Sequence, residues 1–113
     1  NIGSMQSELG RDTITPYAAS KGAVTMLTRG MCVELARHNI QVNAIAPGYF
    51  VTEMTQTLAD DPAFTGWLTK RTPAARWGKP EELIGAAVFL ASGASDFVNG
   101  HLLFVDGGMR VAV

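Results

Sequence analysis

The sequence predicts an α/β fold in which short parallel strands alternate with helices. Segments with helical spacing of apolar residues alternate with short apolar runs, an order typical of right-handed crossovers on a parallel sheet. The chain has 113 residues, 47% hydrophobic and 17% charged, so it can form one small domain around a core. Two or three strands are few for a sheet that needs cover on both faces. Since Ile2 also has the character of a strand end, we expect one part of a doubly wound sheet whose N-terminal half is missing.

The first predicted helix is long. Residues 4–14 show no sustained period, which indicates a loop before it. Thr15 is suited to cap a helix that begins at Pro16, because a proline lacks the N–H that would otherwise be unpaired there. Apolar side chains at helical spacing fill residues 17–38. Asn39 can adopt the left-handed conformation that ends a helix.

The second half of the chain repeats the strand and helix pattern. Residues 40–46 alternate in polarity and end at a Pro-Gly pair, which indicates a strand. Residues 49–79 contain several short helical segments interrupted by prolines and a glycine. Pro80 opens a second helix with acidic residues in its first turn. A turn at residues 99–100 precedes a last strand at residues 101–105.

Composition excludes several classes of function. Nine basic residues stand against ten acidic residues, which excludes an electrostatic nucleic-acid binder. No apolar run approaches the ~20 residues that a membrane span needs. The single cysteine, Cys32, cannot form an intramolecular disulfide, and with two histidines it leaves no zinc-type cluster. We expect a soluble cytoplasmic protein with no bound metal, no nucleic-acid partner and no membrane contact.

Tyr17 and Lys21 are the residues best suited to proton chemistry. They lie four positions apart at the start of the long helix, so both side chains leave one face about a turn apart. A tyrosine is a poor acid or base at neutral pH, and a nearby ammonium group favours its phenolate form. Taken alone, such a pair more often joins an exposed tyrosine to a solvated lysine. Ser4 strengthens the prediction, because a hydroxyl at a strand end can hold a substrate oxygen.

Four motifs occur in order across nearly the whole chain. They are GS at residues 3–4, YAASKGA at 17–23, NAIAPG at 43–48 and VDGG at 105–108. With these motifs the chain resembles the short-chain dehydrogenase/reductase family. The resemblance implies that residues 1–113 are the C-terminal portion of one Rossmann-type domain, and that the full-length protein is a nicotinamide-dependent oxidoreductase.

The resemblance also implies a role for each motif. Tyr17 is expected to be the catalytic acid and base, Lys21 to support it, and Ser4 to orient the reacting oxygen. Residues 52–78 are expected to form a mobile substrate lid, followed by the last helix and strand. The cofactor is NADP(H) or NAD(H), with NADP(H) slightly favoured. The residues expected to bind it are Tyr17, Lys21, Pro47, Gly48, Phe50 and Thr52.

The substrate implied by the resemblance is a small-molecule sugar acid. SMQSELGR at residues 4–11 and RTPAARWG at residues 71–78 resemble members of the family that interconvert D-gluconate and 5-keto-D-gluconate. Arg11 is then a candidate to hold the carboxylate, with Ser4 and Tyr17 at the reacting carbon. Two alternatives stay open: a 3-oxoacyl-carrier-protein reductase or other reductase of the family, and a truncated module that only binds or oligomerises.

The long helix and the glycines carry two further expectations. Apolar or small residues on two faces of residues 16–38 indicate burial on both sides, and the resemblance implies a homo-oligomer, dimer or tetramer, through this helix. The twelve glycines contain no Gly-x-Gly-x-x-Gly motif, so the family's pyrophosphate-binding turn is missing. We therefore expect the isolated 113 residues to be inactive. The first apolar face comprises Val24, Leu27, Met31 and Leu35, and the second Met26, Gly30 and Val33.

Overall fold

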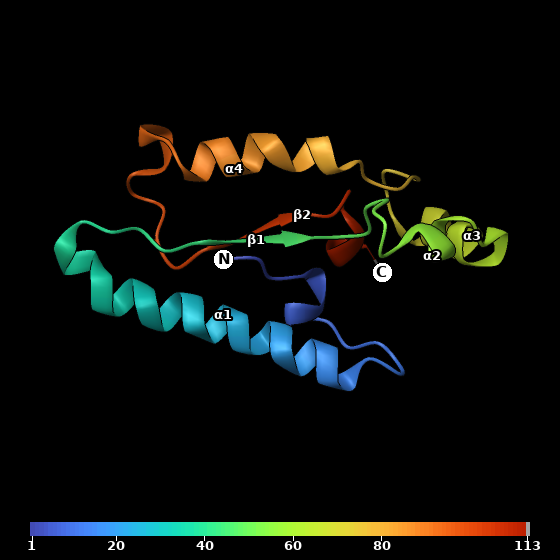
Figure 1. Cartoon of the computed structure of the whole chain (residues 1–113), viewed down its shortest axis with the longest axis horizontal. Helices are drawn as coiled ribbons and strands as arrows, with labels where there is room; N and C mark the ends of the chain where they lie inside the picture. Colours follow the sequence, from blue (N-terminus) through green and yellow to red (C-terminus); the bar gives the residue numbers. More distant parts are fainter. Residues whose placement is uncertain (113) are drawn as a thin grey trace.

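The structure, a computed structural model, describes residues 1–112 and has three layers (Figure 1). Two parallel strands, β1 (Ala44–Pro47) and β2 (Leu102–Val105), form the middle layer. Helix α1 (Thr15–Leu35) runs along one face of the strands and helix α4 (Ile84–Leu90) along the other. The predicted α/β class, with parallel strands covered on both faces, is confirmed.

Strand β1 lies between two other backbone segments. Its register with β2 sets Ala44 opposite Leu102. On its other side Ile2 forms a parallel bridge with Ile45, and the Gly3 amide donates a hydrogen bond to the Ile45 carbonyl at 2.8 Å. Ile2 therefore pairs with the sheet through one bridge, and the longer strand of which it would be the end stays a prediction.

The strand predicted at residues 40–46 is shorter in the structure and begins at Ala44. The reason lies in Val42, whose amide donates to the Asn99 side-chain oxygen at 2.7 Å instead of to a strand ladder. The Val42 carbonyl accepts from the Gly100 amide at 2.9 Å. The predicted turn is present, and Gly100 fits it because its φ of +72° lies in the left-handed region.

The ends of α1 match the prediction except for the cap. The helix begins at Thr15 itself, Ile14 occupies the cap position without a side-chain hydrogen bond, and Pro16 is the second helical residue. A 3₁₀ turn at Ala36–His38 follows the helix. Asn39 then has a φ of 58°, so the predicted left-handed end is confirmed.

Two threonines form the buried side of α1. Thr25 is 6% exposed and Thr28 is 1% exposed. The Thr28 hydroxyl donates to the Val24 carbonyl at 2.8 Å and accepts from the Asn1 side-chain amide at 2.9 Å, so its polarity is satisfied in the interior. Leu27, predicted on the same face as Val24, is 55% exposed, so this part of that face is not covered by the described residues.

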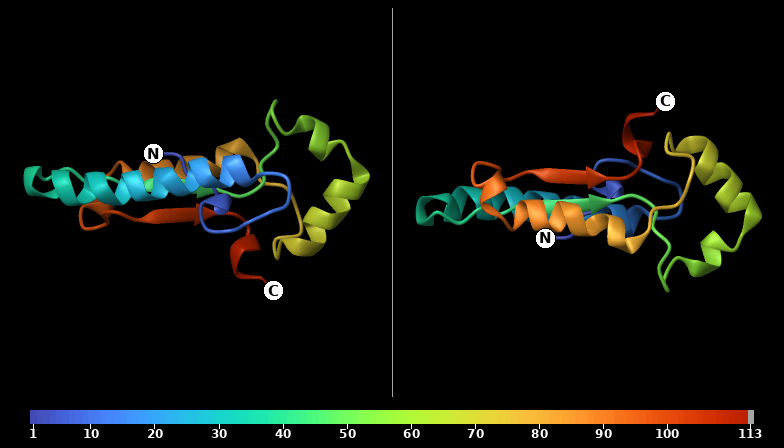
Figure 2. Two further views of the ribbon diagram at one scale, coloured as in Figure 1. Left: turned by 90° about the horizontal axis from the view of Figure 1, so that it is seen from below. Right: turned by 90° about the horizontal axis from the view of Figure 1, so that it is seen from above.

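Two short helices lie beyond the carboxyl ends of the strands (Figure 2). These are α2 (Gln56–Ala59) and α3 (Pro62–Arg71), which confirm the short helical segments predicted there. Asp61 caps α3, since its carboxylate accepts from the Ala63 amide at 2.9 Å. A 3₁₀ turn at Pro80–Leu83 leads into α4. Within the described chain, no helix is long and apolar enough to cross a membrane.

Candidate active site

Ser4 is fixed where the first backbone segment leaves the sheet. It caps a 3₁₀ turn at Met5–Ser7, and its hydroxyl accepts a hydrogen bond from the Gln6 amide at 3.1 Å. The Ser7 hydroxyl donates to the Lys21 carbonyl at 2.9 Å, which ties this turn to α1. Ser4 is buried as a result, at the edge of the sheet where open α/β proteins bind ligands.

The first turns of α1 present Tyr17 and Lys21. The Lys21 ammonium group donates to the Ile2 carbonyl at 3.0 Å, and its nitrogen lies 5.8 Å from the centre of the Tyr17 ring. The Tyr17 side chain is partly open to solvent. The helix therefore presents a phenol and, one turn further on, an ammonium group held against the end of the first backbone segment.

One pocket, of about 220 Å³, lies between the 3₁₀ turn that follows Ser4, the start of α1 and the residues after β1. Four predicted site residues line it: Ser4, Arg11, Tyr17 and Gly48. Lys21 is not among the lining residues, and its ammonium group instead lies beside the pocket, between the Ile2 carbonyl and the Tyr17 ring. The other residues that line the pocket are Met5, Gln6, Ile14, Tyr49, Thr55 and Leu58.

The residues predicted to bind the cofactor after β1 lie in two different places, with Pro47 and Gly48 at the end of the strand and Phe50 and Thr52 further on. Pro47 ends β1, and the Gly48 amide donates to the Val105 carbonyl at 2.9 Å. A Cβ on Gly48 would lie 2.7 Å from the Asp106 Cα, so only glycine allows this close passage of two backbones.

Phe50 and Thr52 do not line the pocket that contains Ser4. Phe50 is buried, and its ring occupies the space in which Gly78 would carry a Cβ. Thr52 lies in an exposed turn, and its amide donates to the Thr55 hydroxyl at 2.9 Å.

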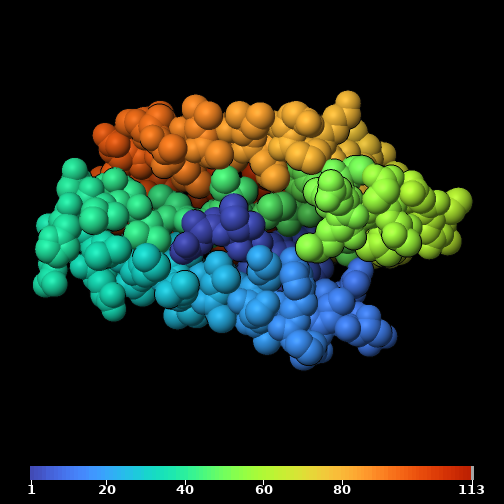
Figure 3. Space-filling model, viewed as in Figure 1, coloured from blue at the N-terminus to red at the C-terminus, as the bar shows by residue number. Residues whose placement is uncertain are grey.

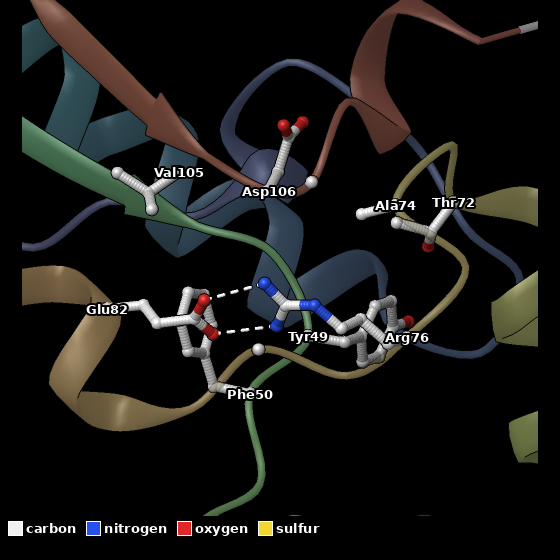
Figure 4. Close-up of a pocket in the computed structure, with 10 residues that line it drawn as sticks. Tyr49, Phe50, Thr72, Ala74, Arg76, Glu82, Val105 and Asp106 are labelled. Atoms are coloured by element: carbon white, nitrogen blue, oxygen red, sulfur yellow. Dashed lines mark hydrogen bonds and ion pairs between the residues drawn. The ribbon is translucent and has the colours of Figure 1, made fainter.

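A second cavity, of about 90 Å³, lies between Phe50 and the carboxyl end of β2 (Figure 4). At its edge the Arg76 guanidinium faces the Glu82 carboxylate and makes two hydrogen bonds, at 2.6 and 2.8 Å. The Lys79 amide also donates to Glu82, at 2.8 Å. The hydrogen bonds from Arg76 and then from Lys79 lower the pKa of Glu82 to about 2. The same pair raises the pKa of Arg76.

We expect the Arg76–Glu82 ion pair to make the stability of the folded protein depend on pH in the acidic range. Because the pKa of Glu82 is about 2 in the folded protein and 4.5 without these partners, its contribution is complete above pH 4.5 and is lost as the pH falls toward 2. Glu82→Gln should therefore lower the denaturation midpoint slightly at pH 7 and have less effect at pH 3, since exposed pairs contribute little. Glu81→Gln, in the same turn, is the control. A Glu82→Gln effect that stays constant from pH 7 to pH 2 would contradict the assignment.

Sequence reasoning missed six residues of the pocket, and two of them, Tyr49 and Gln6, carry polar groups with notable surroundings. The Tyr49 hydroxyl accepts a hydrogen bond from Arg11 Nη1 at 2.9 Å. Gln6 is 8% exposed, and its side-chain oxygen is buried without a hydrogen-bond partner among the described residues. Burying an amide oxygen without a hydrogen-bond partner lowers the stability of the fold, so such an atom indicates a place where a ligand could bind. The sequence carries no sign of it, and only the three-dimensional structure shows it. No group of three or more metal-ligating side chains occurs in residues 1–112.

The arrangement of strands, helices and polar side chains defines a class of protein. Parallel strands lie between two helical layers, and hydroxyl and cationic side chains gather beyond the strand ends. This is the class of α/β proteins that bind ligands at the carboxyl edge of an open parallel sheet.

Comparison with known proteins gives the family. A family model described as enoyl-(acyl carrier protein) reductase matches residues 1–110. The whole chain is 86% identical to 5-keto-D-gluconate 5-reductase of Escherichia coli (strain K12) and 61% identical to gluconate 5-dehydrogenase of Gluconobacter oxydans (strain 621H), covering 44% of each. The chain belongs to the short-chain dehydrogenase/reductase family, as its motifs predicted.

Comparison with a solved structure shows that the fold is also that of the family. The chain matches the crystal structure of a gluconate 5-dehydrogenase from Burkholderia cenocepacia J2315 in complex with NADP and tartrate, with a TM-score of 0.98 and 66% identity. The match covers 100% of this chain and 44% of that one. The chain thus spans less than half the length of the relatives that it matches.

Proposed function

We propose that the protein containing this chain is an NAD(P)-dependent oxidoreductase that interconverts a sugar-acid alcohol and its ketone, most specifically D-gluconate and 5-keto-D-gluconate. The observation that carries this proposal is the meeting of Ser4, Tyr17 and Arg11 in one pocket, with the Lys21 ammonium group beside it. The 86% identity to a 5-keto-D-gluconate 5-reductase supports the choice of substrate.

In the proposed reaction Tyr17 moves the proton. During reduction the Tyr17 hydroxyl donates its proton to the carbonyl oxygen, and during oxidation the phenolate accepts the proton of the alcohol. Ser4, fixed by its capping turn, donates a hydrogen bond to the same oxygen and so orients the reacting carbon. The nicotinamide cofactor, when bound, supplies or accepts the hydride.

Lys21 is suited to hold the cofactor as well as to support Tyr17. An ammonium group has three hydrogens, and Lys21 gives one of them to the Ile2 carbonyl at 3.0 Å. The others are available to the ribose hydroxyls of a nicotinamide nucleotide. Pro47 and Gly48 lie at the end of β1, with Phe50 and Thr52 following, and these four residues are proposed to border the nicotinamide. We propose NADP(H) over NAD(H), since NADP is present in the Burkholderia structure.

The pocket also fits a polar, charged substrate. Arg11 offers a guanidinium for the carboxylate, and such pairs form two parallel hydrogen bonds. The unpaired oxygen of Gln6 can accept from a substrate hydroxyl. A 3-oxoacyl-carrier-protein reductase is the second candidate, because it shares the core motifs. An acyl chain would satisfy neither Arg11 nor Gln6.

The test is turnover by the full-length protein. With NADPH, we expect reduction of 5-keto-D-gluconate to exceed reduction of an acetoacetyl thioester in kcat/KM. The reverse preference would favour the acyl reductase, and no turnover of either ketone would favour a module that only binds or oligomerises. Since the cofactor comes from the cellular nicotinamide pool, we propose a cytoplasmic location.

We further propose that the chain is the C-terminal portion of one domain and needs the rest of that domain for activity. Ile2 is exposed at the sheet edge, and a hollow of about 290 Å³ lined by Ile2, Ile45 and Leu90 adjoins it. Figure 3 shows the N-terminal segment at the surface between α1 and α4. Further parallel strands would cover this edge, and we expect the isolated 113 residues to show no NAD(P)H-dependent reduction.

The outer face of α1 is proposed to pack against a second copy, in a dimer or tetramer. Met26 is 62% exposed and Val33 is 80% exposed, and a Cβ added at Gly30 between them would meet nothing within 4 Å. An apolar helical face open to solvent is typical of an interaction surface.

Val33→Glu should separate the oligomer, because the interface would have to bury an unpaired carboxylate. Sedimentation velocity of the full-length variant measures this, with Thr57→Glu on exposed α2 as a control for the added charge. An unchanged sedimentation coefficient for Val33→Glu would rule out this face.

A further inference from the structure

We propose that Tyr49 is a positioning residue that holds the Arg11 guanidinium in the pocket and thereby sets the preference for carboxylate substrates. The inference deepens the proposed function, since it rests on Arg11 as the group that receives the substrate carboxylate. It assigns a task to a residue that stands outside the catalytic motifs.

The direct contact is a hydrogen bond between distant parts of the chain. Arg11 lies in the loop between Ser4 and α1, and its Nη1 donates to the Tyr49 hydroxyl at 2.9 Å across 38 residues of sequence. Both residues line the pocket that contains Ser4 and Tyr17. Thr13, two residues after Arg11, has a φ of 69°, which a β-branched residue rarely adopts.

Tyr49 is rigid because its ring is the centre of an aromatic cluster. Its centroid lies 5.5 Å from Phe64, 6.1 Å from Trp67 and 5.7 Å from Trp77, each pair in edge-on geometry. The Trp77 indole donates to the Thr65 hydroxyl at 3.0 Å, which joins the cluster to α3. The position of the Tyr49 hydroxyl is therefore fixed by three rings and not by its own backbone alone.

A fixed guanidinium binds a carboxylate better than a free one. An arginine has five N–H donors in one plane, so a single hydrogen bond to Tyr49 leaves the other donors for a paired contact with a carboxylate. Holding the plane before binding removes the loss of side-chain freedom that binding would otherwise cost. The rings of the cluster all belong to residues 49–77. A movement of this segment would therefore carry Tyr49 away from Arg11 and at the same time weaken the contact between Arg11 and the carboxylate.

The experiment uses Tyr49→Phe in the full-length enzyme, which removes only the hydroxyl and keeps the ring in its cluster. We expect KM for 5-keto-D-gluconate to rise roughly tenfold, with kcat changing less than about threefold. The uncharged 5-keto-D-gluconamide has no carboxylate, so its kcat/KM should hardly change. In an Arg11→Met background, Tyr49→Phe should raise KM for 5-keto-D-gluconate little further, because the two residues act as one unit.

A second measurement does not depend on turnover. Tartrate, a dicarboxylate present in the Burkholderia relative, serves as the probe, and calorimetry should give roughly tenfold weaker binding to Tyr49→Phe than to the parent enzyme. Equal tartrate affinity, or equal losses for the acid and the amide, would overturn the inference, as would an absence of tartrate binding to the parent. Failure of the parent to reduce 5-keto-D-gluconate would instead overturn the proposed function, and the tartrate result would still decide the role of Tyr49.

Discussion

Tyr17→Phe should lower kcat/KM of the full-length enzyme by roughly 10²–10⁴ while leaving its fold and oligomeric state unchanged. Phenylalanine keeps the ring and removes only the hydroxyl, which is the group proposed to give or take the proton. The Tyr17 side chain is partly open to solvent and lines the pocket, so the core loses nothing. The measurement is NADPH oxidation with 5-keto-D-gluconate as substrate, with circular dichroism and sedimentation to check the fold.

The chain contains two tyrosines, Tyr17 and Tyr49, so the same substitution by phenylalanine can be compared at both positions. Tyr17→Phe should act mainly on kcat, because it removes a proton transfer in the transition state, whereas Tyr49→Phe should act mainly on KM for the acid. A Tyr17→Phe enzyme that keeps more than a tenth of the parent kcat would refute the role of Tyr17 as acid and base. Equal effects on kcat in both variants would show that the two hydroxyls had been assigned wrongly.

The parts of the fold that were predictable are those fixed by local chemistry. Pro16 near the start of α1, the left-handed Asn39 at its end and the positive φ of Gly100 in the turn all follow from the conformations that these residues allow. Tyr17 and Lys21 are placed together by helical spacing alone. Such features depend on neighbours within a few positions, and sequence carries them directly.

The errors arose where distant residues decide. The buried Thr28 hydroxyl accepts a hydrogen bond from Asn1, 27 residues away, and no helical pattern shows this. Val42 leaves the strand ladder because Asn99 captures its amide. Tyr49 was overlooked because its importance depends on rings that α3 and the following segment bring to it. Periodicity describes one element at a time, and these contacts join several.

Lys21→Met is the second change with a large expected effect. The Lys21 ammonium is held by the Ile2 carbonyl at 3.0 Å and lies 5.8 Å from the Tyr17 ring centre. Its loss therefore removes a cation from the phenol that we propose transfers the proton, and a donor from the proposed ribose site. We expect kcat with 5-keto-D-gluconate to fall by about 10²-fold and the Kd for NADPH, followed by fluorescence, to rise roughly tenfold. Lys70→Met, at an exposed position near the end of α3, is the matched control.

The structure separates these effects from simple destabilisation. Methionine keeps most of the Lys21 side-chain length and removes one exposed hydrogen bond, whose loss costs roughly 1–3 kcal/mol of stability at most. A fall in kcat without a comparable fall in the denaturation midpoint therefore reports on the site itself. Lys21→Arg should restore less than full activity, since a planar guanidinium keeps the charge but cannot reproduce the compact contact with the Ile2 carbonyl. If Lys21→Met binds NADPH and turns over as the parent does, the first turns of α1 are not the place where cofactor and proton transfer meet.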